Sequence, residues 1–84
     1  MIITEKEIQT LESMALGCET SADAELAVME RYQPVVDYLQ NYTTLRRSNE
    51  EQAKLRVWVD AKHNRAENLR SAEALRSALK AIQQ

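Results

Sequence analysis

The sequence predicts an all-α protein: a single domain, residues 1–84, folded as an antiparallel bundle of three helices. Three observations predict it. The chain has one glycine and one proline, so few residues interrupt helices. Two capping motifs precede stretches rich in helix-forming residues. In those stretches apolar residues recur every three or four positions, as they do in amphipathic helices.

The first expected helix covers about residues 5–16. Thr4 and Glu7 form a capping box, in which each side chain satisfies a backbone amide at the helix start. Apolar residues then recur on one face: Ile8, Leu11, Met14 and Ala15. Glycine adopts the left-handed conformation that closes many helices without strain from a Cβ atom. We therefore expect the helix to end at Gly17.

The second expected helix covers about residues 22–46, with Thr20 or Ser21 as its cap. Its apolar stripe contains Val28, Tyr32, Val35, Leu39 and Tyr42. Pro34 lies inside this stripe, removes one backbone donor and crowds the preceding turn. Because the stripe keeps its phase across Pro34, we expect a kink and not a break.

The third expected helix, about residues 49–82, is the longest. Ser48 and Glu51 form its capping box, and no glycine or proline follows. Its apolar positions include Leu55, Trp58, Val59, Ala66, Leu69, Leu75, Leu79 and Ile82. Residues 43–48 contain no glycine, aspartate or proline to mark a turn, so a turn and a continuous helix both remain open.

The last turns of the third helix are expected to extend beyond the other two, because it is the longest. That would expose Leu75, Leu79 and Ile82, and exposed apolar surface of this kind marks an interaction site. Since small domains are often stabilised by association, we expect a homodimer with coiled-coil-like packing.

The two halves of the chain differ in charge. Residues 1–42 carry two basic and eight acidic residues, a net charge of −6, whereas residues 43–84 carry nine basic and five acidic residues, a net charge of +4. The charges can compensate each other internally, or the basic half can face an acidic partner.

A basic ridge is expected on the third helix, since Lys54, Arg65 and Arg76 lie about three turns apart. Arg47 falls near the same line. The ridge can pair with the acidic helices, bind an acidic protein or follow nucleic-acid phosphates. No pair of aromatic residues lies along it to stack on bases. Elsewhere, Trp58 is an interface or core anchor, and Tyr38 is the tyrosine most expected to be exposed.

No residue pattern supports catalysis, and we expect no cofactor, metal or catalytic residue. His63 can share a helix face with Asp60 and Glu67, but as the only histidine it is better explained by a solvated His–Glu pair. Cys18 has no second cysteine and is expected to be a small turn residue. One glycine cannot form a glycine-rich phosphate loop.

These observations favour a small non-catalytic protein-interaction module, an adaptor or inhibitor that occupies a surface on another macromolecule. The alternative is a dimeric nucleic-acid-binding regulator that uses the basic ridge. Residues 1–20 lack a basic start and a long apolar run, so we expect a cytoplasmic protein without a signal peptide. No segment has the length of a membrane span.

Overall fold

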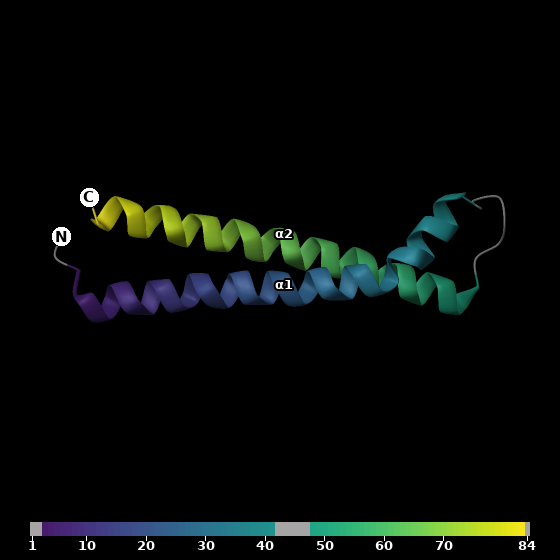
Figure 1. The fold of residues 1–84 in the computed structure, drawn as a ribbon, viewed down its shortest axis with the longest axis horizontal. Helices are drawn as coiled ribbons and strands as arrows, with labels where there is room; N and C mark the ends of the chain where they lie inside the picture. Colours follow the sequence, from purple (N-terminus) through teal and green to yellow (C-terminus); the bar gives the residue numbers. More distant parts are fainter. Residues whose placement is uncertain (1–2, 42–47, 84) are drawn as a thin grey trace.

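The computed structural model describes residues 3–41 and 48–83, and within these ranges it contains two α-helices and no strand. Helix α1 spans Glu5–Asn41 and helix α2 spans Asn49–Gln83. They run antiparallel as a helical hairpin, with both chain termini at the same end (Figure 1). The prediction of an all-α chain is confirmed.

The hairpin is long and narrow. It measures 60 × 16 × 15 Å, and its radius of gyration is 18.3 Å. A compact domain of this length would have a radius of gyration of about 12 Å. Each helix therefore has one helical neighbour, and much of its circumference faces solvent.

A single helix, α1, replaces the first two expected helices, so the three-helix bundle is not observed. Gly17 lies in its interior, with φ outside the positive range, and does not end it. An interior glycine costs only about 1 kcal/mol relative to alanine. The residues that contact α2 continue in phase past Gly17, from Ala15 to Cys18 and Ala22. Packing against α2 thus outweighs the local signal for a helix end.

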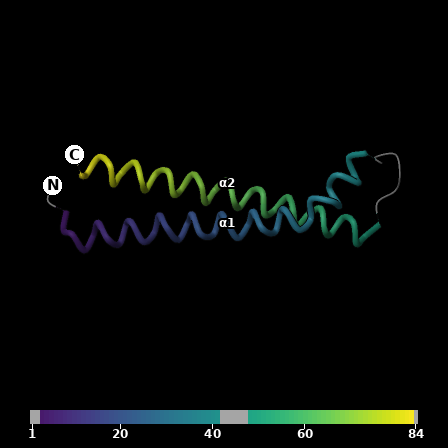
Figure 2. Tube along the Cα trace, in the orientation of Figure 1, coloured from purple at the N-terminus to yellow at the C-terminus, as the bar shows by residue number. Residues whose placement is uncertain are grey.

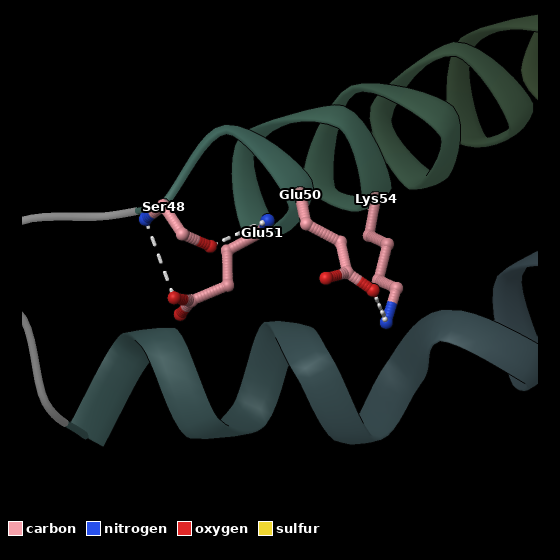
Figure 3. A network of polar contacts seen from close by, with 4 residues as sticks. All are labelled: Ser48, Glu50, Glu51 and Lys54. Carbon is pink, nitrogen blue, oxygen red and sulfur yellow. Dashed lines mark hydrogen bonds and ion pairs between the residues drawn. The ribbon is translucent and has the colours of Figure 1, made fainter.

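The capping prediction is confirmed in full at the start of α2 and in one of its two hydrogen bonds at the start of α1. The Thr4 Oγ1 atom accepts a hydrogen bond from the Glu7 amide at 3.2 Å. At the start of α2, the Glu51 amide donates to Ser48 Oγ at 3.1 Å, and the Ser48 amide donates to Glu51 Oε1 at 3.3 Å (Figure 3). Both halves of the Ser48 capping box therefore form.

Helix α1 continues through Pro34, as predicted. Its last turns, teal in Figures 1 and 2, point away from the line of the preceding turns. The missing amide of proline and the clash of its ring with the preceding turn account for a change of direction here. The choice between a turn and a continuous helix falls mainly on residues 42–47, which lie outside the described residues.

The helices meet along one seam, meaning the row of buried and half-buried side chains on each helix that faces the other. On α1 the seam contains Ile8, Leu11, Ala15, Cys18, Ala22, Glu25, Met29, Tyr32, Val36 and Leu39. On α2 it contains Lys54, Trp58, Ala61, Arg65, Asn68, Ala72, Leu75, Leu79 and Ile82. Both rows alternate steps of three and four residues, which is the heptad pattern of coiled coils.

Alanines form more than half of the fully buried part of the seam. Among the described residues it consists of Ala15, Ala22, Val36, Leu39, Ala61, Ala72 and Leu79. Methyl side chains let two helix backbones approach closely. No polar or charged side chain of the described residues is buried. Close alanine packing, and not a core of large side chains, therefore joins α1 to α2.

The last turns of α2 do not project beyond the hairpin, contrary to the sequence expectation. Leu79 is buried, and Leu75 and Ile82 are half-buried. The reason is that α1 is one continuous helix of 37 residues, so its first turns lie beside the last turns of α2 (Figure 1).

In the described parts of the chain, neither helix holds an apolar run long enough to cross a lipid bilayer.

Candidate interaction surface

The seam leaves two sides of the hairpin uncovered, and heptad geometry assigns residues to each. We call one the charged flank. On α1 it carries Glu5, Gln9, Glu12, Leu16, Glu19, Asp23, Leu26, Glu30, Gln33, Asp37 and Gln40. On α2 it carries Gln52, Leu55, Val59, Lys62, Ala66, Leu69, Glu73, Arg76, Lys80 and Gln83.

We call the opposite side the apolar flank. On α1 it carries Glu7, Thr10, Met14, Gly17, Ser21, Ala24, Val28, Arg31, Val35 and Tyr38. On α2 it carries Glu50, Ala53, Val57, Asp60, Asn64, Glu67, Ser71, Ala74, Ala78 and Ala81. Five of these twenty residues are charged, whereas ten of the twenty-one on the charged flank are charged.

An ion pair joins the two helices across the charged flank. The Arg76 Nη2 atom lies 2.6 Å from Glu19 Oε1, and both side chains are partly exposed. The hydrogen bond that Arg76 donates to Glu19, followed by the negative charge of Glu19, raises the pKa of the Arg76 guanidinium above its usual value. In this contact an acidic residue of the first half and a basic residue of the second half neutralise each other within the chain. The contact also fixes which faces of α1 and α2 lie on the same side.

Trp58 is half-buried in the seam, where its indole Nε1 donates a hydrogen bond to Gln33 Oε1 at 3.1 Å. The Lys62 Nζ atom lies 5.3 Å from the centre of the Trp58 ring, within the range of a cation–π contact. Gln33 also donates a hydrogen bond to Asp37 Oδ1 at 2.9 Å. Trp58 therefore anchors α2 to α1 and sets their antiparallel register.

The predicted basic ridge does not form a row of free cations. Lys54 Nζ lies 3.2 Å from Glu50 Oε1 (Figure 3), and Arg76 pairs with Glu19. Arg65 is half-buried in the seam. Arg47 lies outside the described residues. The nucleic-acid alternative stays a prediction, with two of its expected cations already paired inside the chain.

The other predicted surface residues divide between seam and solvent. Leu75, Leu79 and Ile82 lie in the seam. Tyr38 is 50% exposed on the apolar flank, as expected. It borders an open hollow of about 480 Å³ between the end of α1 and the start of α2, with Val35, Glu51 and Lys54 also in its lining.

His63 and Cys18 are the remaining candidates for metal or thiol chemistry. His63 Nε2 is 3.2 Å from Glu67 Oε1, four residues along an exposed face, which is the pair the spacing predicts. Cys18 is half-buried in the seam and is not a turn residue. Among residues 3–41 and 48–83, no three histidine, cysteine, aspartate or glutamate side chains are grouped so that they could hold a metal ion.

Several exposed apolar residues were not identified from the sequence as surface residues. Leu16 is 60% exposed, and the others are Met14, Val57, Val59 and Leu69. Val59 and Leu69 were assigned to the main apolar stripe together with Trp58; the seam keeps Trp58 but continues through Ala61 and Arg65. Counting heptads with alanine as a core residue would have found the correct seam.

Comparison of the chain with protein-family models, with curated proteins and with solved structures finds no match.

Proposed function

We propose that the chain is a small non-catalytic interaction protein, an adaptor or inhibitor that occupies a surface on another protein. The observation that carries the proposal is the exposure of large apolar side chains on the charged flank. Leu16, Val59 and Leu69 are each at least 40% exposed. Isolated exposed apolar residues are common, but a group on one side of a narrow hairpin offers a site for a partner.

The charges beside these residues define the chemistry of the partner. Helix α1 carries eight acidic and two basic residues. Of the acidic ones, Asp23, Glu30 and Asp37 lie on the charged flank and belong to none of the ion pairs among the described residues. A complementary protein surface would present apolar side chains flanked by lysine or arginine. Such charges steer association and select the partner more than they add affinity.

The test is capture of a partner from source-cell lysate by the tagged full-length chain. Replacing Leu16, Val59 and Leu69 by serine removes the apolar side chains of the charged flank. The matched control replaces Met14 and Val57, which are similarly exposed on the apolar flank, by serine. We expect the wild type and the control to retain the same stoichiometric partner, and the charged-flank variant to lose it.

Raising the salt concentration is expected to weaken the association, because the acidic residues are exposed and their charges are screened. If no protein is retained stoichiometrically, or if the charged-flank variant retains it as well as the wild type does, the proposal is wrong. Circular dichroism of all three proteins verifies that the substitutions leave the helices intact.

A further inference from the structure

The apolar flank has the composition of a second helix-packing surface. Its positions also alternate steps of three and four residues, and Val28 and Val35 are half-buried beside exposed Met14 and Val57. A helix of a two-helix hairpin needs one apolar row. A helix with two adjacent rows can contact two neighbours, as the helices of a four-helix bundle do.

The exposed area of the chain supports a missing neighbour. The hairpin exposes 6578 Å². A folded monomer of 9.6 kDa exposes about 5,100 Å² on average. The excess of about 1,500 Å² exceeds the roughly 800 Å² that each partner buries in a standard interface. Covering one long side of the hairpin would remove an excess of this size.

One pair of opposite charges lies in the middle of the apolar flank. Helix α1 contributes its cation there, Arg31, and α2 contributes the carboxylate of Asp60, whereas Glu7, Glu50 and Glu67 lie farther along the flank. Arg31 and Asp60 belong to none of the ion pairs among the described residues, and both are exposed.

Their positions along the hairpin are fixed by the contact between Trp58 and Gln33. Two residues back along α1 from Gln33 lies Arg31, and two residues forward along α2 from Trp58 lies Asp60. Because the helices are antiparallel, this contact sets Arg31 opposite Asp60, and the contact between Glu19 and Arg76 sets it opposite Asn64, so Arg31 and Asp60 lie within about one helical turn of the same level. A two-fold axis parallel to the long axis keeps each residue at its level and places α1 against α2 of the second copy. Arg31 of each copy then faces Asp60 of the other.

We propose that the occupant of the apolar flank is a second copy of this chain, and that two hairpins form an antiparallel four-helix bundle with Arg31–Asp60 ion pairs between the copies. This inference deepens the proposed function, on which it rests, by giving the interaction protein a dimeric form. It leaves the charged flanks on the outside of the bundle, available to a different protein. It also replaces the sequence expectation that dimers form through Leu75, Leu79 and Ile82.

The first experiment measures the mass of the full chain by light scattering across a wide range of concentrations. We expect a dimer, of twice 9.6 kDa, at all but the lowest concentrations. The combined substitutions Ala24→Glu and Ala74→Glu put carboxylates at exposed positions of the apolar flank and should weaken dimerisation by about a hundredfold or more. The matched control, Ala27→Glu with Ala66→Glu, changes exposed alanines of the same helices outside this flank and should leave the dimer intact.

A charge exchange tests the two-fold arrangement separately. Arg31→Asp and Asp60→Arg should each weaken the dimer, and the double variant should restore it, because each copy then contributes the exchanged pair. Both residues are exposed, so the hairpin itself should fold, and circular dichroism verifies its helicity.

A monomeric wild type at all concentrations overturns the inference, as does a dimer that tolerates Ala24→Glu with Ala74→Glu. A double charge variant no better than the single variants overturns the two-fold arrangement. Binding of another protein depends on Leu16, Val59 and Leu69 and is scored by capture. A failure of dimerisation is therefore distinguished from a failure of the proposed function.

Discussion

Gly17 is the residue at which local preference and tertiary packing disagree most clearly. Its backbone is helical, and a Cβ atom built on it would meet no other atom within 4 Å. The structure does not require glycine at this position, because the backbone is not left-handed and no neighbouring atom approaches closely. It carries only the backbone entropy cost that glycine brings to a helix interior.

Gly17→Ala should therefore raise the free energy of unfolding by about 0.8–1 kcal/mol. Denaturant unfolding at fixed protein concentration measures the change. The matched control is Ala27→Gly, at an exposed position in the same helix, which should lower stability by a similar amount. If Gly17→Ala destabilised the chain, the helix would have to end near residue 17, as the sequence suggested.

The sequence predicted residues correctly where the determining contacts are local. The capping box of Ser48 and Glu51 and the pair of His63 and Glu67 need only neighbours three or four positions away. The roles of Gly17 and Cys18 depend on α2, which lies far away in the sequence. The favourable packing of that helix could not be seen from the residues around them.

At the scale of the helix, Pro34 is the main perturbation of α1. The helix continues on both sides, so the chain tolerates a missing amide and a crowded turn. The packing of Val36 and Leu39, both buried beyond the proline, compensates part of that cost.

Pro34→Ala should restore the missing backbone hydrogen bond and raise the free energy of unfolding by about 1–3 kcal/mol. It should also straighten the last turns of α1. Denaturant unfolding measures the first effect, and the distance between spin labels placed at residues 27 and 41 measures the second. An unchanged label distance would show that packing against α2, and not the proline, sets the direction of these turns.

The sequence predicts the helical residues more accurately than the helix faces that pack together. The expected stripes were drawn through large apolar residues, such as Val59 and Leu69, which the structure leaves exposed. The seam instead runs through Ala61, Arg65 and Asn68, which hydropathy ranks low. Alanine is compatible with core and surface alike, so its role follows from the helix opposite it and not from its own character. The same ambiguity hid the distinction between the charged and apolar flanks.

At the scale of the whole molecule, the alanine seam determines how closely the helices approach. Ala22 is 1% exposed, and its neighbours in the seam, Ala15 and Cys18, are also small. A larger side chain here has no space unless the helices separate, which would also loosen the pair of Glu19 and Arg76. The seam therefore predicts a strong penalty for overpacking, even though the substituted residue would be more hydrophobic.

Ala22→Leu should lower the free energy of unfolding by about 1–3 kcal/mol, because inserted methylene groups force backbone shifts in a close-packed interface. Ala27→Leu is the matched control: it adds the same atoms at an exposed position of α1 and should change stability by no more than about 0.5 kcal/mol. Denaturant unfolding of both variants at one protein concentration measures the difference. Equal effects at the two positions would mean that α1 and α2 do not pack through Ala22. Because the apolar flank is built on the same two helices, separation at the seam should also weaken the proposed dimer, whereas Ala27→Leu should leave its mass unchanged.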